Sequence, residues 1–113
     1  MTTETPTDFA TFWPFYLRQH AKPATRAWHY FGTTLVFAFG IAGAVTGATA
    51  LFWAMPIAGY LFAWFAHFAV ERNRPATFRY PLWSLYADFR MWAYWITGRL
   101  GPELRRAGVV AAS

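Results

Sequence analysis

The sequence predicts an all-α membrane protein in which a transmembrane helical hairpin is flanked by N- and C-terminal interfacial amphipathic helices. The main observation is an uncharged stretch: between Arg26 and Glu71 the chain has no Asp, Glu, Lys or Arg. One transmembrane helix needs about 20 apolar residues, so this stretch is long enough for two helices and a tight turn. A buried hairpin of a soluble protein would need polar faces toward water, and residues 34–65 offer none.

The charge distribution predicts the orientation in the membrane. All ten Lys and Arg residues lie before or after the uncharged stretch, and the expected turn has none. The positive-inside rule therefore predicts that both termini lie in the cytoplasm. The expected protein is a multi-pass protein of the bacterial inner membrane. The excess of Arg over Lys points to a GC-rich bacterial genome. The net charge of +5 favours anionic lipid headgroups over a nucleic acid partner, because no soluble binding fold is left outside the hairpin.

The composition excludes further classes of protein. The chain has no cysteine, so it has no disulfides and no thiolate ligands or nucleophiles. Ser84 and Ser113 are the only serines and no nucleophile elbow is present, which disfavours a serine hydrolase. Residues 1–8 contain acidic side chains but no basic one, so we expect no signal peptide.

The predicted organisation is one membrane domain between two tails: a disordered tail at 1–8, the domain at 9–101 and a loose tail at 102–113. The domain begins with a short helix from residue 9 to about 20, capped by Asp8 or Thr7. Its aromatic side chains and its arginine suit the level of the lipid headgroups. Pro23 then separates it from the next helix.

The two membrane spans are expected at about 27–46 and 50–70, with the turn between them. Gly43 and Gly47 belong to a series of small residues that would let a neighbouring helix approach closely. That neighbour is either the second span or another protomer, so a homo-oligomer is compatible with the pattern. An aromatic, amphipathic segment at about 82–97 is too polar to span and predicts an interfacial helix.

The candidate site consists of histidines near one membrane face. His29 and His67 stand at the two ends of the uncharged stretch, so a hairpin places them at the same depth, where ionisable groups are costly. His67 and Glu71 have the i, i+4 spacing of one helix face and would chelate a metal, orient the imidazole or form a helix-end salt bridge. His20 is either a surface histidine or, because Pro23 lets the chain turn, a third member of the group.

These ligand types predict a particular metal chemistry. Imidazole and carboxylate ligands with open positions suit non-haem Fe(II), and would also accept Zn or Mn. A site at the headgroup boundary would meet a lipid whose polar end carries the reacting carbon. The sequence therefore predicts a lipid or fatty-acid substrate for any enzyme built on these residues.

Two motifs resemble the short bacterial branch of the Mpo-like family, over roughly residues 12–100. The first motif is Phe15-Tyr16 followed by His20-x8-His29-x2-Gly32, with Arg26 between the two histidines. The second motif is Gly59-Tyr60 followed by Ala63-Trp64-x2-His67-Phe68-x2-Glu71-x-Asn73-x-Pro75-Ala76-x-Phe78-x2-Pro81, and then by Ser84 and Asp88. A fungal relative is an iron(II)-dependent dioxygenase that shortens 2-hydroxy fatty acids by one carbon.

The resemblance implies roles for seven residues. It marks His20, His29, His67 and Glu71 as catalytic metal ligands, and Arg26, Asn73 and Asp88 as groups that support the ligands or bind the substrate carboxylate. It implies a membrane-embedded iron(II)-dependent dioxygenase that acts on 2-hydroxy fatty acids or related lipids. The alternative is a non-catalytic lipid-binding or scaffold hairpin, in which the same side chains only hold the helices together.

Overall fold

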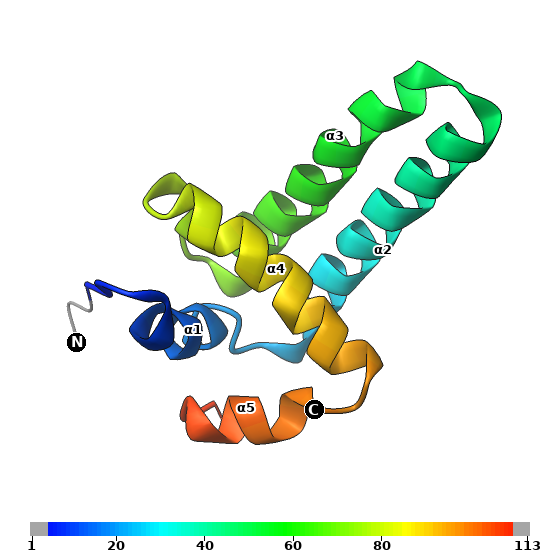
Figure 1. Cartoon of the computed structure of the whole chain (residues 1–113). Coiled ribbons are helices and arrows are strands. Elements are labelled where there is room, and N and C mark those ends of the chain that lie inside the picture. The colour runs from blue at the N-terminus through cyan, green and yellow to red at the C-terminus, as the bar shows by residue number, and fades with distance from the viewer. Residues whose placement is uncertain (1–4, 110–113) are drawn as a thin grey trace.

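The fold is an apolar helical hairpin standing on a compact base of shorter helices (Figure 1). The structure is a computed structural model that describes residues 5–109, and this part of the chain contains helices and no strands. In chain order the elements are α1 Phe9–Arg18, α2 Pro23–Thr46, α3 Thr49–Phe65, the π-helix η1 Ala66–Glu71, the 3-10 turn η2 Ala76–Phe78, α4 Pro81–Ile96 and α5 Leu100–Arg106.

The hairpin is formed by α2 and α3, which run side by side away from the other helices (Figure 1). α2 has 24 residues, and α3 continues through η1 for 23 residues, Thr49–Glu71. Both are long and apolar enough to cross a membrane. Large apolar side chains cover their outer surfaces and are more than half exposed, among them Ile41, Val45, Trp53, Ile57 and Leu61.

The two glycines that matter most to the hairpin act in different ways. A Cβ atom on Gly32 would lie 3.1 Å from the Phe62 Cβ atom and 3.3 Å from the Ala58 carbonyl oxygen, so this glycine permits the close approach of α2 and α3. Gly47 ends α2 in the left-handed region at φ 75°, and its N–H donates to the Gly43 carbonyl over 2.9 Å. A Cβ atom there would meet nothing within 4 Å. Within the chain Gly47 therefore mediates no contact between α2 and α3, and its role is to cap α2.

The base is held together by aromatic and aliphatic side chains of α1, α4 and α5. Asp8 is the N-cap of α1 and accepts a 2.9 Å hydrogen bond from the Thr11 N–H. Phe12 and Tyr16 of α1 are fully buried, as is Met91 of α4. α4 lies across the base of the hairpin (Figure 1), where the Trp92 Nε1–H donates to the Thr34 hydroxyl of α2 over 3.0 Å.

The C-terminal segment is part of this core, so the prediction of a loose tail from residue 102 onward is wrong for residues 102–109. Leu104 of α5 is only 4% exposed, and the Trp13 indole N–H donates to Glu103 over 2.8 Å. The Val109 N–H closes the segment on the Leu104 carbonyl over 2.9 Å. Residues 110–113 and, in the predicted N-terminal tail, residues 1–4 lie outside the described residues.

Candidate metal centre

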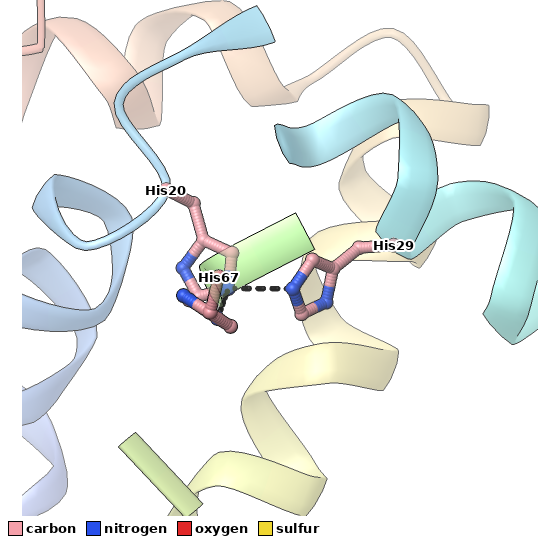
Figure 2. Close-up of side chains that lie close together, drawn as sticks. All are labelled: His20, His29 and His67. Atoms are coloured by element: carbon pink, nitrogen blue, oxygen red, sulfur yellow. Dashed lines mark hydrogen bonds between the residues drawn. The ribbon is translucent and has the colours of Figure 1, made fainter. Parts of the chain in front are cut away.

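Three imidazole rings from three separate segments meet at the base of the hairpin (Figure 2). The His20 Nε2 atom lies 3.1 Å from the His29 Nε2 atom and 3.0 Å from the His67 Nε2 atom. All three side chains are buried, with at most 5% exposed. Within the described residues they form one group with metal-ligating atoms all within 4.8 Å of one another. The prediction that the hairpin brings His29 and His67 to one level, with His20 folded back beside them, describes this arrangement.

His20 reaches the group because the chain turns sharply between α1 and α2. The Arg26 guanidinium, only 3% exposed, donates from Nη1 to the His20 carbonyl over 2.8 Å and to the Ala21 carbonyl over 3.0 Å. Pro23 stands in the first turn of α2, where its missing N–H costs nothing. Arg26 therefore fixes the backbone of the turn that carries His20.

His67 lies in the π-helical segment η1, which continues α3. Single π-helical turns inside α-helices are rare and occur frequently at functional sites. The segment ends at Arg72 in the left-handed region at φ 63°, and the Asn73 N–H then donates to the His67 carbonyl over 2.9 Å. This wider turn and its cap bring the Asn73 side chain back to the His67 ring.

The hydrogen bonds around the group fix the protonation of two rings. The His20 Nδ1 atom lies 2.7 Å from the Tyr16 carbonyl oxygen, which only accepts. The His67 Nδ1 atom lies 2.7 Å from Asn73 Oδ1. Asn73 Nδ2 in turn donates to the Gln19 carbonyl over 3.0 Å and to Gln19 Oε1 over 3.1 Å, which settles which end of the amide is the acceptor. Both rings therefore carry their proton on Nδ1.

Asp88 of α4 favours the same form of His29. Its Oδ1 atom lies 3.7 Å from the His29 Nδ1 atom, too far for a direct hydrogen bond but near enough to attract a proton on that nitrogen. The Tyr16 hydroxyl donates to the same carboxylate oxygen. Burial raises the pKa of Asp88 to about 7, and the hydrogen bond from Tyr16 opposes this shift.

The resulting arrangement suits a cation. With all three protons on Nδ1, the Nε2 atom of His20 lies 3.1 Å from that of His29 and 3.0 Å from that of His67 with no proton between them, so their lone pairs repel one another. Burial, with the neighbouring His29 and His67 rings, lowers the pKa of His20 well below its usual value, so this ring is neutral at pH 7 as a metal ligand must be. Two ligands at right angles, each about 2.1 Å from an ion, are about 3.0 Å apart. The donor set therefore fits a divalent metal that accepts imidazole, including Fe(II), Zn and Mn.

Glu71 lies outside this group and contacts the start of α2. Its Oε1 atom accepts hydrogen bonds from the Thr25 hydroxyl over 2.6 Å and from the Lys22 backbone N–H over 3.1 Å. A carboxylate is favourable there because the helix dipole is positive at its N-terminus. The His67 ring is hydrogen-bonded to Asn73, so the expectation that Glu71 orients an imidazole is not met by this geometry.

Two residues with direct contacts at the site were given no role in it from the sequence, although Tyr16 belongs to the first motif. Tyr16 supplies both the carbonyl for His20 and the hydroxyl for Asp88, and Gln19 anchors Asn73. The sequence did contain a signal for Tyr16. This residue stands four positions before His20, near the end of a predicted helix, and the last four carbonyls of a helix lack partners within the helix, so the Tyr16 carbonyl is available to the His20 ring. For Gln19 the sequence offers no comparable signal, because its partner is 54 residues away.

One comparison with known proteins identifies a family. The family description "2-hydroxy-palmitic acid dioxygenase Mpo1-like" matches residues 6–100, which include every histidine of the site and most of the supporting base. The chain matches no curated protein and no solved structure. Since the matched segment covers most of the sequence, the chain belongs to the Mpo1-like family.

Proposed function

We propose that this chain is a membrane-embedded, iron(II)-dependent dioxygenase that acts on a 2-hydroxy fatty acid or a related lipid. The observation that carries the proposal is the meeting of three buried imidazoles, with the His20 Nε2 atom 3.1 Å from that of His29 and 3.0 Å from that of His67. The family description supports the reaction class, since it is that of a dioxygenase of 2-hydroxy-palmitic acid.

In this proposal the protein binds the ion and holds the imidazoles, and the ion supplies the redox chemistry. His20, His29 and His67 are the ligands, and a bound iron(II) would make molecular oxygen reactive, while the 2-hydroxy acid supplies the electrons that reduce it. Tyr16, through its carbonyl, and Asn73 keep the ligand rings in the correct tautomer. Three protein ligands leave positions on the ion for oxygen and substrate.

The surface of the hairpin supports membrane embedding. Apolar side chains such as Trp53, Ile57 and Leu61 are 59–75% exposed, and only 17–22% of the most apolar part of each long helix is buried within the protein. Leaving such a surface in water would cost roughly 25 cal/mol for each Å² of apolar area, so a lipid environment is favoured. With both ends of the described segment, residues 5–109, at the base, we propose a two-span topology with both termini in the cytoplasm.

The metal content of the purified protein and of two variants tests the proposal. His67→Ala removes a ligand and should lose both iron and turnover of 2-hydroxypalmitate under oxygen, while the protein still inserts into the membrane. Glu71→Gln should keep the metal, because Glu71 contacts Thr25 and the Lys22 backbone and not the imidazole group. Arg99→Ala, at an exposed position, serves as the control for handling.

The opposite result would favour the scaffold alternative. If the unaltered protein takes up no iron, zinc or manganese and His67→Ala is less stable than it, the histidines only hold the helices together. Reporter fusions after Ser113 and in the turn at Gly47 test the topology separately. A C-terminus on the far side of the membrane would contradict the proposed orientation.

A further inference from the structure

We infer that the cavity between α2, α3 and α4 binds the alkyl chain of the lipid substrate and encloses only about its first eight carbons. The inference rests on the proposed function and adds the binding site for the apolar part of the substrate. The cavity has a volume of about 290 Å³. Its lining includes His29, Val36, Met55, Gly59, Leu85 and Asp88.

The cavity has one polar end, and that end is the metal centre. His29, a proposed ligand, and Asp88, which lies 3.7 Å from its ring, both line the cavity. Apart from Thr33 and Tyr60, the remaining wall is apolar and comes from all three helices. A molecule with a polar head and an apolar chain would therefore place its head beside the metal and its chain along the hairpin.

The length of the cavity follows from the helix that lines it. From His29 to Val36 α2 advances seven residues, which at 1.5 Å per residue is about 10 Å. An extended chain advances about 1.2 Å per bond, so this distance accommodates about eight carbons. The volume is also at the small end of the range of about 300–1,000 Å³ for ligand pockets. The outer half of a sixteen-carbon chain would therefore leave the cavity toward the lipid.

The width of the cavity is limited by close contact between α2 and α3. A Cβ atom on Gly59 would lie 3.2 Å from the Val36 Cγ2 atom. Near the far end, a Cβ atom on Gly40 would lie 2.9 Å from the Met55 Cε atom. The space suits an unbranched chain, so the site should reject branches near the head and tolerate differences in chain length beyond the cavity.

Photo-crosslinking in lipid nanodiscs tests this assignment without requiring turnover. Two probes are used, 2-hydroxypalmitic acid with a diazirine at carbon 6 and the same acid with a diazirine at carbon 14. The carbon-6 probe should label cavity residues such as Met55 and Leu85. The carbon-14 probe should instead label lipid or outward-facing positions.

Two variants make the test specific to the cavity. Val36→Phe fills the cavity and should reduce carbon-6 labelling by about tenfold, which corresponds to about 1.4 kcal/mol. Ile57→Phe adds an aromatic ring on the outward face of α3, where the side chain is 65% exposed, and should change nothing. Leu85→Trp blocks the cavity from α4, and replaces Val36→Phe if that variant does not fold.

The outcomes separate this inference from the proposed function. Equal labelling of Ile57 and Met55 by the carbon-6 probe, in a protein that turns over substrate, would overturn the chain site and leave the dioxygenase intact. Cavity labelling that Val36→Phe abolishes, in a protein without metal or turnover, would support the lipid site and overturn the dioxygenase.

Discussion

Replacing Asn73 by alanine should weaken metal binding by about 10- to 100-fold without preventing the protein from folding. Asn73 touches no metal-ligating atom, but its Oδ1 atom accepts a hydrogen bond from the His67 Nδ1–H over 2.7 Å. Its Nδ2 atom is held by two oxygens of Gln19 at 3.0 and 3.1 Å. Without the amide, the His67 ring is free to rotate and to move its proton to Nε2, where it would block the metal.

The expected magnitude follows from the position of Asn73 behind a ligand. Loss of a hydrogen-bond partner behind a ligating histidine costs about 10- to 100-fold in metal affinity, which is about 1.4–2.8 kcal/mol. Gln19→Ala is the matched control, because it removes only the Gln19 side-chain oxygen and leaves the carbonyl that also holds Asn73. One neutral hydrogen bond is worth about 1 kcal/mol, so this variant should lose no more than about fivefold.

The assay is competition for Fe(II), Zn(II) or Co(II) against a chromophoric chelator in detergent, with His67→Ala as the reference without a full ligand set. Helical content and thermal unfolding of each variant are recorded alongside. An Asn73→Ala affinity within twofold of the unaltered protein, while His67→Ala loses the metal, would refute the argument that Asn73 orients the His67 ring.

Three further predictions concern the base, the hairpin and the metal. Leu104→Ala should lower the free energy of unfolding by about 2–5 kcal/mol in a denaturant titration, because this side chain is only 4% exposed. Arg105→Ala, at an exposed position, should leave the free energy of unfolding unchanged. Equal stability of the two variants would mean that α5 does not pack against the base. Gly32→Leu should separate α2 from α3 and abolish metal binding. Gly47→Ala should lower the stability measured by thermal unfolding by only about 1–2 kcal/mol, because alanine is strained at the positive φ of this position. A larger loss of stability in Gly47→Ala than in Gly32→Leu would contradict the contact assigned to Gly32. Metal at 100 times its dissociation constant should stabilise the protein by about 2.7 kcal/mol, and a chelator should remove this gain. His67→Ala should show neither effect. A metal-induced gain in stability that survives in His67→Ala would mean that the ion binds elsewhere.

The sequence was sufficient to predict the helical elements, since hydropathy and breakers act locally. The spans predicted at about 27–46 and 50–70 correspond to α2 and to α3 with η1, and the segment predicted at about 82–97 corresponds to α4. Loss of charge over a long stretch, glycine at a turn and proline at a helix start each fix the backbone within a few residues. The exception is α5, because a seven-residue helix that contains Gly101 and Pro102 gains its stability from packing and not from helix propensity.

The sequence also indicated which imidazoles lie close together. A hairpin places the two ends of its uncharged stretch side by side, so His29 and His67 had to share one level. From Pro23 the sequence indicated that the chain turns between His20 and His29, but not whether His20 turns toward the other two histidines. The hydrogen bonds from Arg26 to the carbonyls of His20 and Ala21 fix this turn.

Only the tertiary structure decided what surrounds each ring. The i, i+4 spacing placed Glu71 beside His67, yet Glu71 binds the start of α2 and Asn73 takes the contact with the ring. The anchoring of Asn73 by Gln19 joins the segment after η1 to the end of α1, 54 residues away in the sequence. Helix periodicity describes neighbours within one turn, whereas the proton on an imidazole is fixed by acceptors that folding brings from distant parts of the chain.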